Sequence, residues 1–125
     1  MEKNLIRLFY LHKHVLVVIK EVKMEYKFEI KEGMLKVSVP KELDHHVSNQ
    51  LREEADLLID AYHVKKLVFD FADTEFMDSS GIGVLIGRSR NMGFEGGKVI
   101  ATNLSPRVKQ IFRLSGLYQM ISVEE

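Results

Sequence analysis

A continuous apolar stretch in the middle of the chain constrains the fold more than any other feature. Residues 67–72 carry one charge among five apolar side chains, which is typical of a strand covered on both faces. A few residues later, Asp78-Ser79-Ser80-Gly81 forms a turn signal, and residues 82–88 have the composition of a helix start. A buried strand, a turn and a helix in succession predict a layered α/β fold with parallel inner strands.

The segments on either side continue this alternation of strands and helices. Apolar residues recur at every second position in the expected strands and at helical spacing in the expected helices. The expected elements are strands at 26–30 and 34–39, a helix at 44–62, a strand at 66–72, a helix at 79–92, a strand at 98–101, a helix at 105–116 and a strand at 118–123. Asp44 is the expected N-cap of the first helix, and Ser105 followed by Pro106 opens the last helix. The order β-β-α-β-α-β-α-β predicts a single α/β domain with a mixed, mostly parallel sheet and flanking helices.

Composition excludes several classes of function. The chain has 125 residues, of which 46% are hydrophobic and 29% charged, so it has enough apolar surface for a core. The formal net charge is zero, and no basic excess points to a nucleic-acid partner. The chain has no cysteine, which excludes disulfides and thiol chemistry, and it lacks an apolar run of about 18 residues that could span a membrane. We expect a cytoplasmic domain that binds neither nucleic acid nor membrane.

Residues 1–23 differ in charge from the rest of the chain. They hold five Lys/Arg and two Asp/Glu, whereas residues 24–125 hold 13 basic and 16 acidic side chains. Lysine and histidine interrupt the apolar patches and no small-residue cleavage site follows, which argues against an export signal, while an amphipathic surface helix is an alternative. Residues 20–24 are compatible with codons that form a purine-rich ribosome-binding sequence ahead of an ATG. We therefore expect residues 1–23 to be a mis-assigned extension and Met24 to be the true start.

The turn at residues 78–81 lies where a helix is expected to begin. Unpaired backbone N–H groups and the positive end of the helix dipole collect at such a place. A serine there either caps the helix or carries a phosphate that these groups stabilise. The physical chemistry alone favours capping and leaves phosphorylation as the alternative. The small residues Ser79, Ser80, Gly81 and Gly83 suit close docking of a partner, which a phosphate beside Asp78 would block.

The glycines that follow the serines do not form a nucleotide-binding loop. Gly81, Gly83 and Gly87 have the spacing G-x-G-x-x-x-G, one residue longer than the dinucleotide fingerprint, and the lysine of a P-loop is missing. Gly83 and Gly87 share one face of the expected helix. We expect them to allow close packing against the sheet or a partner.

Catalytic and metal-binding patterns are weak in this sequence. His45 and His46 are adjacent, so on a helix they point about 100° apart and cannot readily share one metal ion. A serine hydrolase would need the pattern G-x-S-x-G, which is absent here, and Asp78 would oppose an oxyanion beside Ser79. We expect no catalytic residue, no metal and no bound cofactor.

Several basic residues on the later helices are expected to face solvent, with a few of them available to an acidic partner. These residues are Arg88, Arg90, Arg107, Lys109 and Arg113.

The turn and several other segments resemble one family. Residues 78–83, Asp-Ser-Ser-Gly-Ile-Gly between a strand and a helix, resemble the phosphorylation motif of the STAS-domain anti-sigma factor antagonists, also called anti-anti-sigma factors. Residues 42–46, Glu-Leu-Asp-His-His, are similar to the sporulation branch of that family, which antagonises the anti-sigma F factor. Gly87-Arg88, residues 104–109 and residues 115–117 continue the match, which covers about residues 24–123.

The resemblance implies a STAS domain at residues 24–125 and a switch based on Ser79. In that family an anti-sigma factor, itself an ATP-dependent serine kinase, binds the antagonist and phosphorylates the first serine of the pair. The unmodified antagonist captures the anti-sigma factor and frees the sigma factor, and a serine phosphatase resets the modified form. The partner kinase uses the ATP, so the resemblance implies no cofactor of the chain itself.

The resemblance also implies a docking surface around the serine, to which Asp44 in the loop before the first helix belongs. The implied partner-binding residues are Asp44, Asp78, Ser79, Ser80, Gly81 and Gly83. An antagonist in another partner-switching pathway, such as a stress response, is one alternative. A small-molecule or nucleotide-binding STAS module is another.

Overall fold

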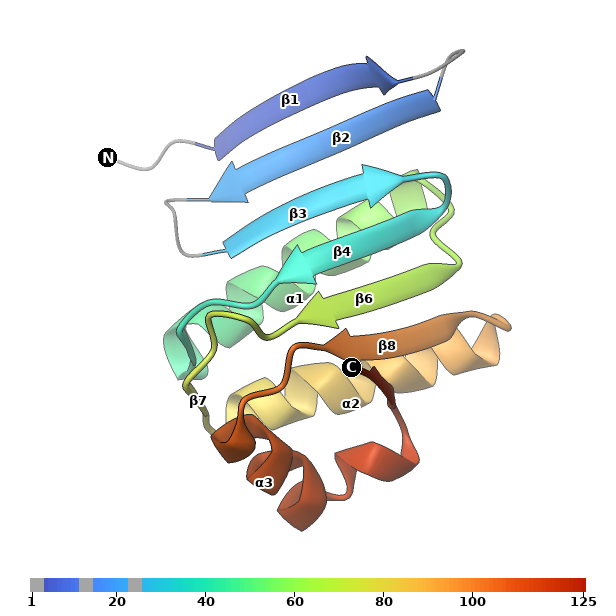
Figure 1. Ribbon diagram of the computed structural model, residues 1–125. Helices are drawn as coiled ribbons and strands as arrows, with labels where there is room; N and C mark the ends of the chain where they lie inside the picture. Colours follow the sequence, from blue (N-terminus) through green and yellow to red (C-terminus); the bar gives the residue numbers. More distant parts are fainter. Residues whose placement is uncertain (1–3, 12–14, 23–25) are drawn as a thin grey trace.

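The computed structural model describes residues 4–11, 15–22 and 26–125, and its main element is a seven-stranded sheet (Figure 1). The strands lie in the order β1-β2-β3-β4-β6-β8-β9. Their bounds are β1 Asn4–Leu11, β2 Val15–Val22, β3 Tyr26–Lys31, β4 Met34–Ser38, β6 Lys66–Asp70, β8 Lys98–Thr102 and β9 Ser122–Glu124. Strands β1 to β4 pair antiparallel, whereas β4, β6, β8 and β9 pair in parallel. From β3 onward the sheet is therefore mixed and mostly parallel, which confirms the predicted fold class.

The hairpin between β3 and β4 is closed by a tight turn. Lys31 pairs with Met34, and the two residues between them, Glu32 and Gly33, have φ angles of 49° and 77°. Two consecutive residues with positive φ form the type I′ turn, whose twist matches that of the flanking strands. The two strands predicted at 26–30 and 34–39 are confirmed, and they pair with each other.

Strands β1 and β2 form a second hairpin that continues the sheet beyond β3. Strand β2 pairs with β3 from Val17 opposite Lys31 to Val22 opposite Tyr26. The described parts of residues 1–23 are thus strands, so the alternative of a surface helix is wrong. Met24 itself lies outside the described residues, and its role as the true start stays a prediction.

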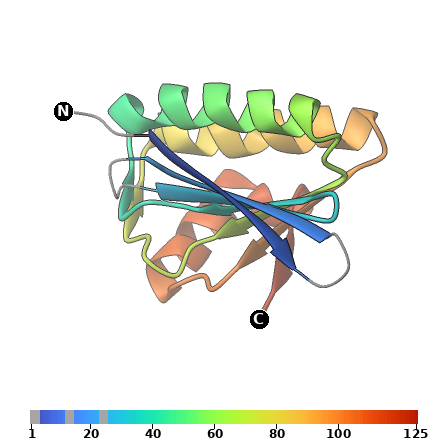
Figure 2. The ribbon, with the colours of Figure 1, turned by 90° about the horizontal axis from the view of Figure 1, so that it is seen from above.

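In the described residues three α-helices pack with the sheet, and two of them lie side by side on one face (Figure 2). These two are α1 (His45–Ala61) and α2 (Ser79–Phe94), whereas α3 (Pro106–Ser115) lies beyond β8 (Figure 1). The predicted start and end of α3 are confirmed: the hydroxyl of Ser105 accepts from the N–H of Val108 at 3.2 Å, and Gly116 ends the helix with a φ of 78°. Glycine adopts this left-handed conformation without strain.

The core lies between the sheet and the helices. Phe28, Leu35, Leu67 and Phe69 are fully buried side chains of successive strands, as expected for strands that face covering helices. Phe112 of α3 belongs to the same core cluster and makes an edge-to-face contact with Phe71, just after β6, at a centroid distance of 5.5 Å. Burial of each such side chain contributes roughly 1.5–3 kcal/mol, so the framework that holds the helix starts is well anchored.

Two parts of the secondary structure differ from the prediction. A two-stranded parallel sheet of β5 (Glu42–Leu43) and β7 (Phe76–Met77) was not predicted, because two residues are too short to show a periodicity. The predicted strand at 118–123 is largely wrong: residues Leu117–Gln119 form the 3₁₀ helix η1, and β9 begins only at Ser122. Leu117 is fully buried, so the chain makes one compact turn against the core before it enters the sheet.

Candidate functional site

Two very short strands bring the starts of α1 and α2 together. In the β5–β7 pair, Leu43 lies opposite Met77, and the backbone N–H of Asp78 donates to the carbonyl of Leu43 at 3.3 Å. Each of these strands leads within two residues into a helix, β5 into α1 and β7 into α2. The pairing therefore fixes where both helices begin.

Gly81 lets β5 approach the first turn of α2 closely. A Cβ atom at this position would lie 2.5 Å from the carbonyl oxygen of Leu43 and 2.9 Å from its Cγ. Any larger residue would push the β5 backbone away from the helix start, because no side chain tolerates such a contact with a backbone oxygen. The glycine of the predicted motif is thus required by the internal packing of the site.

Aspartates hold the first backbone N–H groups of both helices. The Asp44 carboxylate accepts from the N–H groups of His46 and Val47 at 3.0 and 3.1 Å. The Asp78 Oδ1 accepts from the N–H groups of Ser80 and Gly81 at 2.8 and 3.1 Å. Asp44 is the N-cap of α1, as predicted, and Asp78 is the N-cap of α2.

The second oxygen of Asp78 reaches the other helix. Its Oδ2 accepts from the backbone N–H of His45, the first residue of α1, at 2.9 Å. One carboxylate therefore joins the starts of two helices, which both carry partial positive charge. No local pattern predicted this double role, because the two segments lie 33 residues apart.

Ser79 is the first residue of α2 and is exposed to solvent, whereas Ser80 is partly buried. Because Asp78 caps the helix, the expectation that a serine of the pair does so is wrong. In the part of the chain that the structure describes, neither the hydroxyl nor the backbone N–H of Ser79 has a hydrogen-bond partner. Ser79 thus offers a free hydroxyl at the positive end of a helix.

Five of the six predicted partner-binding residues form this one cluster: Asp44, Asp78, Ser79, Ser80 and Gly81. Gly83, the sixth, is exposed one turn into α2. A Cβ atom at Gly83 or at Gly87 would meet nothing within 4 Å, so the expected close packing of these two glycines against the sheet is wrong. Their spacing showed that they share a helix face but not which face is turned to the sheet.

Arg88 is the exception among the basic residues that were expected to face solvent. Its side chain is only 8% exposed, and its Nε lies 2.9 Å from Oδ1 of Asp56 on α1. The geometry is that of an ion pair without an aligned hydrogen bond, and within the described residues the buried Nη1 has no acceptor. Burial lowers the pKa of the Arg88 guanidinium, an effect that the charge of Asp56 opposes. The pair links α1 and α2 away from their first turns.

Phe76 is a feature of the site that the sequence patterns did not single out. It lies two residues before Asp78, its side chain is 40% exposed, and the guanidinium of Arg107 lies 6.0 Å above its ring. A cavity of about 560 Å³, lined by residues 72–75 and 105–107, adjoins it. An exposed aromatic residue next to a motif was the signal that could have drawn attention to this position.

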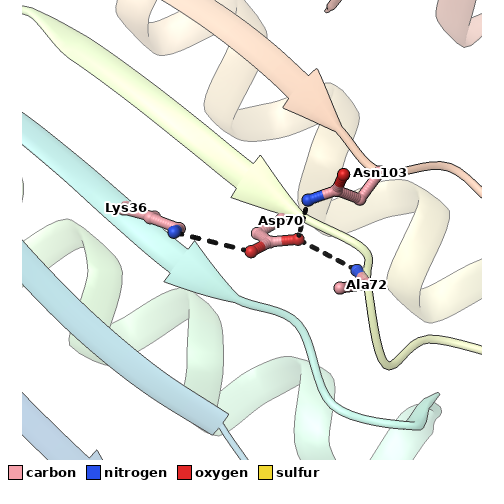
Figure 3. Close-up of polar contacts among 4 residues, drawn as sticks. All are labelled: Lys36, Asp70, Ala72 and Asn103. Carbon is pink, nitrogen blue, oxygen red and sulfur yellow. Dashed lines mark hydrogen bonds and ion pairs between the residues drawn. The ribbon is translucent and has the colours of Figure 1, made fainter. Parts of the chain in front are cut away.

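A polar network orders the loops at the carboxyl ends of the parallel strands (Figure 3). Asp70 lies at the end of β6, and its Oδ1 accepts from Nδ2 of Asn103 at 3.0 Å and from the N–H of Ala72 at 2.9 Å. Its Oδ2 forms an ion pair with Nζ of Lys36 at 3.6 Å. Burial by itself raises the pKa of Asp70, but these hydrogen bonds and the charge of Lys36 together hold it below the ordinary value. The network holds the start of the loop that leads from β6 to β7, and β7 in turn leads into Asp78 and Ser79.

Residues 4–11, 15–22 and 26–125 contain neither a cluster of metal-ligating side chains nor a membrane-spanning helix. No group of three or more His, Cys, Asp or Glu side chains in these ranges could hold a metal ion. In the same ranges no helix has both the length and the apolar character needed to cross a membrane.

Comparison with known proteins places this geometry in a family. The STAS domain model matches residues 25–125. An anti-sigma F factor antagonist from Paenibacillus polymyxa is 31% identical over 100 residues, which cover 80% of this chain and 86% of that protein. An anti-sigma-B factor antagonist from Bacillus subtilis (strain 168) is 30% identical over 92 residues, which cover 74% and 83% of the two chains.

A solved structure of similar fold is also related in sequence. It is described as the Bacillus cell fate determinant SpoIIAA in the phosphorylated form, and it is 30% identical to this chain. The two structures superpose with a TM-score of 0.66 over 80% of this chain and 91% of that one.

Proposed function

Since this chain belongs to the STAS-domain family, we propose that it is an anti-sigma factor antagonist, a cytoplasmic binding protein without enzymatic activity of its own. It captures an anti-sigma factor and so frees the sigma factor that the anti-sigma factor would hold. Relatives of that name are 31% and 30% identical to it. The observation that carries the proposal is the exposed Ser79 at the first position of α2, inside the motif at residues 78–83.

Phosphorylation of Ser79 switches the binding off. The hydroxyl is accessible and free of partners among the described residues, and it lies at the positive end of α2, where a phosphate is stabilised. A phosphate adds about −1.5 to −2 charge directly beside Asp78, on a surface otherwise made of small side chains. The bound anti-sigma factor is the kinase and supplies the phosphoryl group from ATP, and a serine phosphatase removes it.

The sporulation pathway of sigma F is the pathway we assign. Its support is the loop at residues 42–46, which resembles that branch and which the β5–β7 pair brings next to the family motif at residues 78–83. The identities to the sigma F and sigma-B relatives, 31% and 30%, do not separate the two pathways. Parallel binding measurements do: we expect at least tenfold tighter binding to an anti-sigma F factor than to an anti-sigma-B factor, and the reverse order would overturn the assignment.

The switch is tested with the purified chain, a kinase-type anti-sigma F factor and ATP. We expect mass spectrometry to find one phosphate, on Ser79, and gel filtration to show that the complex dissociates as the phosphate appears. Ser79→Ala should remain unmodified and should stay bound in the presence of ATP. The matched control is Ser80→Ala, which should still be phosphorylated because its change leaves the exposed hydroxyl in place.

Two results would contradict the switch. One is loss of the Ser79→Ala complex on addition of ATP, and the other is a phosphate that appears on a residue other than Ser79. If no anti-sigma factor binds the unmodified chain at all, the proposed function itself is wrong.

A further inference from the structure

The carboxylate of Asp78 is the polar link between the first turns of α1 and α2. Oδ1 accepts from two N–H groups of α2, those of Ser80 and Gly81, and Oδ2 accepts from one N–H group of α1, that of His45. The three distances lie between 2.8 and 3.1 Å, in the range of well-formed hydrogen bonds. A single negative charge thus serves the positive ends of two helices.

The N–H groups of α1 depend on this carboxylate for one position only. Asp44 holds the N–H groups of His46 and Val47, and the N–H of Ser48 donates to the backbone carbonyl of Asp44 at 2.9 Å. Asp78 therefore supplies the acceptor for His45, the first N–H of the helix, and its loss would affect this position selectively.

Ser79 follows Asp78 directly, so a phosphate on its hydroxyl would be added next to this carboxylate. Two anions would then share one helix start. A phosphate can accept from the free N–H of Ser79 and from the N–H of Ser80, which Asp78 now holds. Like charges at such short range repel each other, and the phosphate, which carries more charge than the carboxylate, competes with it for the shared N–H groups.

We propose that Asp78 couples the charge on Ser79 to the start of α1: phosphorylation displaces the carboxylate and releases the N–H of His45. This inference rests on the proposed function for the identity of the modification. The released N–H lies next to Asp44, in the loop that the family resemblance assigns to the docking surface. Phosphorylation of Ser79 then changes the surface of this chain that binds the anti-sigma factor. The change affects the first turns of both α1 and α2, in shape as well as in charge.

Residue-resolved amide exchange with water, measured by NMR, tests the coupling. Phosphoserine is placed at position 79 by genetic code expansion, so that no partner kinase is required. We expect exchange of the His45 amide to become about tenfold faster, which corresponds to the loss of a hydrogen bond to a charged acceptor. The amides of His46 and Val47, which Asp44 holds, should exchange at unchanged rates.

The matched variant is Asp78→Ala, in which the His45 amide should already exchange fast and phosphoserine should add nothing. If this variant does not fold, Asp78→Asn replaces it, since its amide keeps the side-chain shape and one acceptor without the charge. Unchanged exchange of His45 in the phosphorylated wild-type chain would overturn the coupling. Equal acceleration of His45, His46 and Val47 would overturn it as well, because it would mean general fraying of α1.

The outcome is separable from that of the proposed function. If the chain with phosphoserine at position 79 still binds the anti-sigma factor, the switch fails, whatever His45 does. If binding is lost while the His45 amide is unaffected, the switch stands and the coupling through Asp78 fails.

Discussion

The starts of α1 and α2 are built from the same kind of sequence but offer a partner different surfaces. In each, an apolar strand residue is followed by an aspartate that caps the helix: Leu43 and Asp44 in one, Met77 and Asp78 in the other. In α1 the first three N–H groups are all held by these two aspartates. In α2 the first N–H group, that of Ser79, has no acceptor among the described residues.

The difference shows that two helix starts with the same capping motif can differ in how many donors they leave free. The α1 start is closed, since every donor is used and imidazole side chains follow the cap. The α2 start keeps one donor and one hydroxyl free on a surface of small residues. The cap formed by Asp78 reaches the second and third N–H groups of α2 and leaves that of Ser79 unused. This is the place where we propose that the phosphate is added.

The largest effect is expected where the two helix starts touch. Gly81→Ala should lower the free energy of unfolding by about 3 kcal/mol, because the new Cβ would lie 2.5 Å from the carbonyl oxygen of Leu43. Gly83→Ala is the matched control on the same helix, where a Cβ meets nothing within 4 Å. There we expect a gain of roughly 0.5–1 kcal/mol from the higher helix propensity of alanine. Urea unfolding measures both, and similar values for the two variants would contradict the close contact.

Arg88 tests whether the second link between α1 and α2 depends on charge or on packing. Arg88→Ala should cost about 2 kcal/mol, because it removes a buried aliphatic stem. Arg88→Met keeps most of that volume, and the Asp56 side chain left behind is 38% exposed and can be hydrated. Its cost should therefore stay below about 1 kcal/mol. The exposed Arg90→Ala serves as control, and equal losses in the alanine and methionine variants would show that the ion pair itself stabilises the helices.

The N-cap aspartates of α1 and α2 should differ in how much each contributes to the free energy of unfolding. Asp78→Ala removes acceptors from both helices and should cost about 1.5 kcal/mol, whereas Asp44→Ala affects α1 alone and should cost about 1 kcal/mol. Thermal unfolding at pH 7 measures the two values under the same conditions. A larger loss for Asp44→Ala than for Asp78→Ala would mean that the bond from His45 to Asp78 adds no stability.

The smallest expected effect concerns Asp70, whose contribution to the free energy of unfolding depends on pH. The pKa of Asp70 is lowered in the folded chain, so its contribution to stability is present above the pKa of the unfolded carboxyl, about 4, and is lost as pH falls through the lower folded value. Asn103→Gly removes one of its hydrogen bonds while tolerating the φ of 58° at that position. We expect a loss of less than about 1 kcal/mol at pH 7 and a smaller loss near pH 3. Urea unfolding at the two pH values checks this, and an equal loss at both would exclude Asp70 as the cause.

Much of this site could be predicted from the sequence where the chemistry is local. The N-cap at Asp44 and the caps of α3 follow from side chains that bond to backbone groups two or three residues away. The serine pair was placed correctly at a helix start for the same reason. The N-cap position itself is occupied by Asp78, which accepts from the N–H groups of Ser80 and Gly81.

Features that depend on distant parts of the chain could not be predicted. The β5–β7 pair, the bond from His45 to Asp78 and the burial of Arg88 all join segments about 30 residues apart. A periodic pattern shows which residues share a face but not what lies opposite, which is why Gly83 was expected to pack and Arg88 to face solvent. Short elements such as β7 carry no period at all.

The brevity of the β5–β7 pair has a consequence for how the chain matures. Two residues on each side cannot form a sheet that stands alone, and the pair closes a loop of more than 30 residues, so we expect it to form only after the larger sheet has assembled. Ser79 takes its place at a helix start at that late stage. Under the proposed function, a chain still emerging from the ribosome, or a misfolded one, would then not present Ser79 as a substrate for the kinase, and only completely folded molecules would be switched.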